Sequence, residues 1–291
     1  VSCCEGKEQC VYLHLSPGEN SRNVREGEWK TVPLRGSRNL TRWMFCEPLP
    51  DGSLVIGSKN PDGQIVHCVF DEELRPRLRK IRTCGWIMSL RKFDVDNDGD
   101  FDIVYSDRKG PESGVGWIEF PELMDHPIGA QNEECMFLDV HLVAKELIVV
   151  CPIRKGFLRY LTPTSDVRKP WSSSRLNIPG NSALAKAVSI GDIDKDGKLD
   201  IAHTRADARG KTGVFWTALP ESPDYTKDDT TELATHDISG TARGIKFDRI
   251  ELIDLDQDGD LDLMTCEERD NMGVVWYENP LGDAKEDSRE P

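Results

Sequence analysis

The sequence predicts an all-β protein of the β-propeller class, built from four-stranded antiparallel blades. Two repeated features lead to this prediction: an acidic pattern of nine residues that occurs three times, and a short strand pattern, Gly-x-x-Trp, that follows each copy. Repeats of roughly 40 to 60 residues that are rich in short strands are typical of propellers. Long helices are not expected, because no segment sustains an apolar period of about 3.6 residues.

The acidic pattern reads Asp-x-Asp-x-Asp-Gly-x-x-Asp and occupies residues 94–102, 192–200 and 254–262. Four carboxylates in one turn repel one another unless a cation offsets the repulsion, and calcium accepts roughly six to eight oxygen ligands in flexible geometry. Side chains would bind the ion from positions one, three, five and nine, and the backbone carbonyl would bind it from position seven. The sequence therefore predicts three calcium sites, with ligands Asp94, Asp96, Asp98, Asp100 and Asp102; Asp192, Asp194, Asp196, Lys198 and Asp200; and Asp254, Asp256, Asp258, Asp260 and Asp262.

The EF-hand is the nearest alternative for these loops, but it requires a bidentate Glu at position twelve and a helix on each side. Position twelve is Tyr105, His203 or Thr265. The short apolar segments that follow the loops alternate as strands do. A solvated acidic turn that binds no ion is the remaining alternative.

Six copies of one strand pattern support four strands per blade. Three copies are strong and three are weaker: 114–121, 213–220 and 273–280, then 9–17, 63–70 and 156–163. We expect this pattern to be the third strand of each blade and the segment after the acidic loop to be the second. Apolar inner strands are expected at 43–46, 86–90, 135–138, 185–190 and 245–250, and more polar outer strands at 29–34, 78–82 and 232–238.

Residues 1–280 are expected to form one propeller domain, and residues 281–291 a loose acidic tail. The chain begins at the end of a second strand, which predicts truncation on the N-terminal side, and its last blade ends at a third strand. We therefore expect five blades with an inner strand plus one partial blade, in a longer propeller or an open ring. The units around 43–82 and 135–178 retain only Asp51, Gly52 and Asp139 of the acidic pattern, so no calcium is expected there.

Composition limits the possible functions. The net charge of −15 argues against general binding to nucleic acid or to anionic membranes. No apolar run approaches the roughly 18 residues of a membrane span. Most of the nine cysteines lie in apolar strand-like segments, which favours buried thiols, with a disulfide involving Cys3, Cys4 or Cys10 as the alternative. Six isolated histidines and the lack of a GxSxG motif give no catalytic set.

The acidic loops, the ending Val274–Pro280 and the segment Ser106–Pro111 resemble FG-GAP/VCBS repeats over almost the whole chain. These repeats form the blades of integrin α-subunit propellers and of many bacterial secreted proteins, and the two segments are similar to bacterial VCBS-repeat proteins of unassigned function. The resemblance implies a seven-bladed propeller, calcium in the acidic loops, and a secreted, periplasmic or cell-surface location. It also implies a ligand on the face opposite the calcium loops.

The loops after the second strands are rich in basic residues, and the starts of the inner strands should reach the same face. The candidate ligand-binding residues are Lys7, Trp43, Lys59, Trp86, Arg108, Lys109, Arg154, Lys186, Lys246 and Arg269. Basic side chains with exposed tryptophan suit an anionic glycan or another carboxylate-bearing ligand. The alternative is that these loops are merely polar and the inner tryptophans belong to the core.

The first functional hypothesis is therefore a non-enzymatic module, stiffened by calcium, that binds a glycan or protein partner. The second is a lyase acting on uronate-containing polysaccharides, in which a basic side chain neutralises the carboxylate and another group removes the α-proton. Lys186, Lys246 and Arg249 are the first candidates for that chemistry. A passive scaffold is a third possibility.

Overall fold

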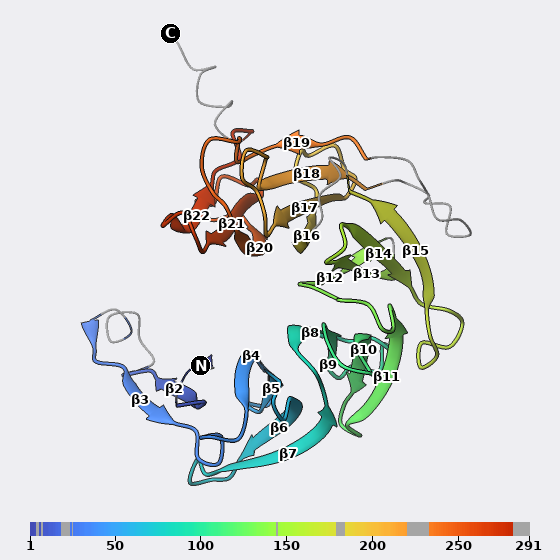
Figure 1. Ribbon diagram of the computed structural model, residues 1–291. Helices are drawn as coiled ribbons and strands as arrows, with labels where there is room; N and C mark the ends of the chain where they lie inside the picture. Colours follow the sequence, from blue (N-terminus) through green and yellow to red (C-terminus); the bar gives the residue numbers. More distant parts are fainter. Residues whose placement is uncertain are drawn as a thin grey trace. The chain divides into compact units, whose positions relative to one another are not determined.

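The computed structural model describes residues 1–3, 6, 8–18, 24, 26–143, 145–178, 184–219 and 233–281. Within these ranges, 22 strands form six antiparallel sheets (Figure 1). Val24 and Glu26 are the only described residues in helical conformation. The expectation of an all-β protein without long helices is confirmed for this part of the chain.

The chain divides into two compact units, Val1–Glu133 and Glu134–Pro291. The first unit contains three sheets. They are formed by β1 (Ser2–Cys3), β2 (Val11–Leu15) and β3 (Lys30–Pro33); by β4 (Arg42–Pro48), β5 (Leu54–Lys59), β6 (Gln64–Phe70) and β7 (Pro76–Thr83); and by β8 (Ile87–Phe93), β9 (Asp102–Asp107), β10 (Gly114–Glu119) and β11 (Met124–Gly129).

The second unit also contains three sheets. They are formed by β12 (Asp139–Val143), β13 (Glu146–Ile153), β14 (Phe157–Thr162) and β15 (Ser172–Asn177); by β16 (Ala185–Gly191), β17 (Asp200–Arg205), β18 (Val214–Ala218) and β19 (His236–Asp237); and by β20 (Phe247–Ile253), β21 (Asp262–Glu267) and β22 (Gly273–Tyr277).

Within every sheet the strands pair in the order in which they occur along the chain, which is the topology of a propeller blade. The protein is thus an all-β propeller of antiparallel blades, four of them with four strands and two with three. We expected five blades and a partial one, but the first three strands pair as a sheet of their own, and the count is six. The expectation of a seven-bladed propeller stays a prediction.

The hydrophobic core of each unit lies between neighbouring sheets. In the first unit, Ile65 and Ile87 pack with Ile103 and Ile118, which brings the second and third sheets together. In the second unit, Val150 and Phe215 belong to one cluster that joins the fourth and fifth sheets. In the third sheet, the second and third strands, β9 and β10, are buried along their whole length.

Two of the strand boundaries differ from the sequence prediction. Residues 135–138 are buried but form only isolated bridges, Cys135 to Ile153 and Phe137 to Ala187, and the first strand of that sheet is β12. An apolar segment can pack against two sheets at once without pairing along either of them, and hydrophobicity alone does not distinguish this from a strand. The outer strand expected at 232–238 contains only His236 and Asp237, and residue 232 lies outside the described ranges.

All eight described cysteines are free thiols, and five of them are buried. The prediction of buried thiols is therefore confirmed for most of them. Cys3 and Cys10 do not form the alternative disulfide, and Cys4 lies outside the described residues. Of the expected acidic tail at 281–291, only Leu281 is described.

Candidate functional site

Each acidic loop connects the first and second strands of its sheet. Pairing of Phe93 with Asp102 closes the first hairpin, and the pairs Gly191–Asp200 and Ile253–Asp262 close the other two. The sixth residue of the loop, Gly99 in the first copy, has a φ of +99°, with no atom near the position of an added Cβ. Glycine is therefore needed for backbone conformation rather than for space.

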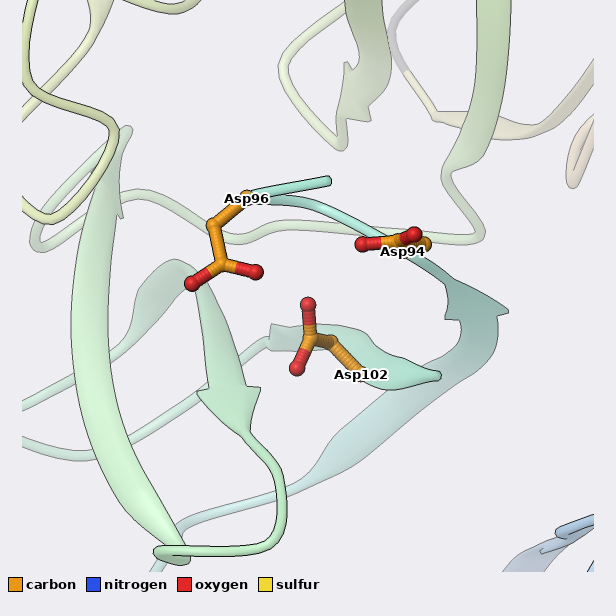
Figure 2. Close-up of side chains that lie close together, drawn as sticks. All are labelled: Asp94, Asp96 and Asp102. Carbon is orange, nitrogen blue, oxygen red and sulfur yellow. The ribbon is translucent and has the colours of Figure 1, made fainter. Parts of the chain in front are cut away.

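The carboxylates of each loop gather around one point. Asp94, Asp96 and Asp102 each offer an oxygen, and these oxygens lie within 4.8 Å of one another. Figure 2 shows the three side chains turned toward a shared space. The same positions cluster in the second loop, and positions one, three and five cluster in the third: Asp192, Asp194 and Asp200; Asp254, Asp256 and Asp258. Each of these clusters could hold a metal ion.

The ninth aspartate also has a structural role. In the first loop, Asp102 accepts hydrogen bonds from the backbone N–H groups of Val95 (2.8 Å) and Phe120 (3.0 Å). In the third, Asp262 accepts them from Leu255 (3.1 Å) and Asn279 (2.9 Å). This carboxylate therefore joins the loop to the end of the third strand.

The fifth aspartate accepts the N–H of residue seven, at 2.8–3.0 Å, in all three loops, as in the pairs Asp98–Asp100, Asp196–Lys198 and Asp258–Asp260. The position-seven residue thus takes part through its backbone, which explains why a lysine is tolerated there. Its side chain is exposed at Asp100 and Lys198 and buried at Asp260.

The electrostatics of the clusters fit a bound cation. Burial, together with the neighbouring loop carboxylates, raises the pKa of Asp102 to about 7 and that of Asp200 to about 6. The Oδ1 atoms of Asp192 and Asp254 are buried without a hydrogen-bond partner in the described chain, while their Oδ2 atoms accept from Gly197 (3.0 Å) and Gly259 (3.2 Å). An all-oxygen ligand set of this kind suits a hard divalent cation.

A second group of predicted residues meets at the other end of the strands in the first unit. Lys59 Nζ lies 4.5 Å from the centre of the Trp86 ring, Arg108 Cζ lies 4.6 Å from it and Lys109 Nζ lies 5.1 Å from it. We call Lys59, Trp86, Arg108 and Lys109 the Trp86 cluster. Three cationic side chains around one half-buried indole make it the most basic feature of the predicted ligand site in this unit.

Backbone contacts hold the Trp86 cluster together. Asn60 N–H donates to the carbonyl of Gly85 (2.9 Å), and Arg108 N–H donates to that of Trp86 (2.8 Å). The loops after β5 and β9 therefore lie against the start of β8, as the blade topology predicts.

Asp107 positions this cluster, although the sequence analysis did not single it out. Its buried carboxylate accepts the N–H groups of Gly85 (3.0 Å), Trp86 (2.8 Å) and Lys109 (3.3 Å), and burial raises its pKa in spite of these donors. Glu267 does the same in the second unit, accepting from Ile245 and Lys246 at 3.0 Å.

The sequence could have indicated Asp107 and Glu267, because both occupy the same position in the repeat. Asp107 and Glu267 end the second strands that follow loops 94–102 and 254–262, at the same offset from the first aspartate of each loop. Burial acts to raise the pKa of Glu267, but its backbone donors outweigh burial and lower it to about 2.

Two of the other predicted ligand residues of the first unit need comment. Trp43 is 1 % exposed, packs in a hydrophobic cluster and donates from Nε1 to the carbonyl of Ser37 at 2.8 Å. Its assignment to the ligand site was therefore wrong, because the start of β4 turns this ring into the core. Lys7 lies outside the described residues.

The basic candidates of the second unit are mostly paired with carboxylates. Lys186 is buried with its Nζ 2.7 Å from Asp248 Oδ1, and Lys246 contacts Glu268. Arg154 Nε lies 3.9 Å from Glu134, whereas Arg269 is exposed. Burial raises the pKa of Asp248 to about 6. In this unit, acidic side chains from neighbouring strands therefore pair with most of the predicted basic residues and offset their charge.

No protein-family model matches the chain, and no curated protein matches it in sequence. Solved structures share its fold. An auxiliary nutrient binding protein from Bacteroides thetaiotaomicron superposes with a TM-score of 0.53 at 10% identity, over 84% of this chain and 57% of that one. A protein described as a 6-phosphogluconolactonase from Bacteroides fragilis gives 0.56 at 12% identity, over 95% and 80%. The Dos1 propeller gives 0.51 at 10% identity, over 87% and 62%.

These similarities establish the class of protein as a β-propeller. At such low sequence identity, these similarities show only that the fold is shared. The chain spans less than two thirds of the nutrient binding protein and of the Dos1 propeller. Within the described ranges, no helix has the length and apolar character needed to cross a membrane.

Proposed function

We propose that this chain is a calcium-stabilised propeller of the FG-GAP/VCBS type that acts as a binding module for an anionic ligand. An acidic glycan is the first candidate, and an acidic protein partner is the second. The observation that carries the proposal is the Trp86 cluster, in which three cationic side chains lie within 5.1 Å of one indole ring.

The chemistry of the cluster favours an anion. Like charges held close together repel one another, and a bound carboxylate or sulfate relieves that repulsion while accepting charge-assisted hydrogen bonds. Arg108 offers a planar donor fork, whereas Lys59 and Lys109 act as point charges, so the set can bind a group with several oxygens. Asp107 fixes the backbone beneath, which lowers the cost of ordering the site on binding.

Calcium is the proposed ion of the acidic loops, and its role is structural. The cluster geometry and the unpaired oxygens of Asp192 and Asp254 support a divalent cation. Several of the ligating carboxylates are exposed, which favours the weak calcium affinity of extracellular modules, roughly 10⁻⁴ to 10⁻³ M. This supports a secreted, periplasmic or cell-surface location.

The free thiols must be stable at such a location. Burial raises the pKa of Cys3, Cys46 and Cys84 to about 12, which keeps these groups protonated and poorly reactive toward oxidants. A fully reduced protein isolated from an oxidising compartment would agree with the proposal. Recovery of the protein only from the cytoplasm would contradict this location.

Titration calorimetry with the full chain in calcium-containing buffer tests the binding proposal. Polygalacturonate and dextran sulfate should bind, uncharged dextran should not, and added salt should weaken the binding. The variant Lys59→Ala/Lys109→Ala should bind about thirtyfold more weakly or worse, since it removes two charge-assisted contacts that contribute roughly 1 kcal/mol or more each. Lys169→Ala is the matched control, because Lys169 is an exposed lysine of the second unit that pairs with Asp166 at 3.3 Å. Unchanged binding by the double variant, or no acidic polysaccharide bound, would reject the proposal.

The lyase alternative has weaker support. Lys186, Lys246 and Arg249 each contact a carboxylate, and the Arg249 Nε to Glu251 distance is 2.7 Å. A lysine that is held in an ion pair is a poor base for removing an α-proton. An increase in ultraviolet absorbance from unsaturated uronate on any of the acidic polysaccharides would restore this alternative.

A further inference from the structure

A cavity of about 500 Å³ opens in the second unit and is lined by side chains of β18, β19, β21 and β22. Trp216, Trp276 and Tyr277 contribute aromatic surface, and Asp237 and Glu278 contribute carboxylates. These five residues lie outside the Trp86 cluster and the acidic loops, whereas Ile193 and Leu261 of two acidic loops also line the cavity. The volume is in the range of small-molecule sites.

Trp276 is more exposed than the tryptophan at the same repeat position in the third sheet. Trp117, Trp216 and Trp276 occupy the same position of the Gly-x-x-Trp repeat. The ring of Trp117 is buried against His126 of β11, with the ring centres 4.7 Å apart, and Trp216 stacks on His236 of β19 at 3.9 Å. The described part of the last sheet ends at β22, and Trp276 is 44 % exposed. It is one of the residues that line the cavity.

The polar lining of the cavity is negatively charged. Asp237 is exposed, and its Oδ1 accepts the N–H of Gly240 at 3.0 Å and the hydroxyl of Thr212. Burial and then the Asp237 charge raise the pKa of Tyr277. The lining contains no lysine or arginine.

Burial lowers the pKa of Arg205, and the charge of Asp237 opposes this shift. The Arg205 side chain is buried over the Phe215 ring, with Cζ 4.2 Å from the ring centre, and it does not line the cavity.

We propose that this cavity binds a small organic cation, such as a quaternary or alkylated ammonium group. Aromatic faces attract such cations through their quadrupole, and a nearby carboxylate adds a full charge that a neutral ligand cannot use. Trp276 supplies the exposed aromatic surface and Asp237 the charge. The site is independent of the anion site of the first unit and takes a ligand of opposite charge.

Tryptophan fluorescence titrations with the full chain in calcium-containing buffer test the proposal. Choline is the probe, and its uncharged isostere 3,3-dimethyl-1-butanol is the matched control ligand. Choline should quench or shift the emission saturably, and the isostere should bind about tenfold more weakly or not at all. Trp276→Ala and Asp237→Asn should each weaken choline binding by about fivefold or more, whereas Trp276→Phe should retain part of it.

Trp29→Ala is the matched control variant, since Trp29 is 45 % exposed and belongs to the first unit. It should leave choline binding unchanged, and all these variants should still bind acidic polysaccharides if that proposal holds. Equal affinity for choline and its isostere, or full binding by Trp276→Ala, would overturn the cation site. So would saturation by neutral glucose oligosaccharides without any response to choline.

Discussion

Arg82 is a buried cation that several acidic groups share. Its guanidinium is 9 % exposed, and Nη1 donates to Asp125 Oδ2 at 3.0 Å and to the Tyr105 hydroxyl. Nη2 lies 3.8 Å from Asp107, the carboxylate that holds the Trp86 cluster. A side chain of β7 thus secures both the packing against the next sheet and the base of the candidate ligand site.

Replacing Arg82 with alanine should lower the free energy of unfolding by roughly 3–5 kcal/mol, because it leaves buried carboxylate charge without its partner. Urea denaturation measures the change. Arg75→Ala is the control: this arginine is 61 % exposed and pairs with Asp71 and Glu73, so its loss should cost about 1 kcal/mol or less. Equal effects of the two substitutions would show that Arg82 stabilises the fold no more than an exposed arginine does.

We expect the free energy of unfolding to depend on pH through the protonation of His203. It is buried, stacks on Phe215 at 4.7 Å and shares a hydrogen bond with Thr217 at 2.8 Å. Burial, followed by the Arg205 charge, lowers its pKa to about 3. The folded protein therefore keeps His203 neutral, whereas the unfolded chain takes up a proton near its ordinary pKa of about 6.5.

The stability that depends on His203 is complete above about pH 6.5 and is lost as the pH falls toward 3. In this window the native chain should lose up to about 1.4 kcal/mol per pH unit more than His203→Gln, which has no such proton to bind. Denaturation curves at several pH values measure the two slopes. Parallel slopes would show that His203 is not buried in its neutral form.

At the scale of the element, the acidic hairpin loops are the most local feature of the chain. Spacing alone places the carboxylates, because two residues with positive φ, at positions four and six, and a short turn leave them little freedom. The sequence therefore predicted the loops, their glycines and the hairpins that they close. It did not predict that the ninth aspartate also binds the end of the third strand, since that contact joins distant residues.

Asp192→Asn should reduce the number of calcium ions bound per chain by one, because it weakens the ligand set at the unpaired Oδ1. Lys198→Ala should leave the number unchanged, because position seven takes part through its backbone. Calorimetry or native mass spectrometry counts the ions. Loss of an ion in Lys198→Ala, or none in Asp192→Asn, would contradict the assigned ligand roles.

The strands were predicted less accurately than the acidic loops. All six copies of the strand pattern form strands, and the three Gly-x-x-Trp copies are the third strands β10, β18 and β22, whereas residues 135–138 form isolated bridges instead of an inner strand. Alternation and hydrophobicity report how strongly a segment is buried, but pairing depends on which neighbour it meets. Trp43 and Trp86 show the same limit, because both begin inner strands and only Trp86 remains accessible.

At the scale of the whole molecule, calcium binding would reduce the net negative charge and stabilise the folded state. Three bound calcium ions would change the formal charge from −15 to −9, since each ion adds two. An ion that binds only the folded state stabilises it by about 3 kcal/mol at a hundredfold excess over its dissociation constant. Chelation with EDTA should therefore lower the melting temperature.

Hydrogen exchange should locate this effect within the second unit. On chelation, β17 and β21, which follow acidic loops, should exchange faster, while β13 and β14, whose sheet has no acidic loop of this pattern, should change little. Mass spectrometry of peptic peptides measures the difference. Uniform change across these sheets would mean that calcium does not act through the loops.

The sequence by itself determined the fold class, the blade repeat and the three acidic hairpins, because each of these depends on residues that are close together along the chain. Tertiary structure decided which basic residues gather and which are neutralised. Lys59, Trp86 and Arg108 meet because separate strand ends converge, and Lys186 is paired because Asp248 comes from a different strand. Such contacts depend on the packing of sheets, which local spacing does not encode.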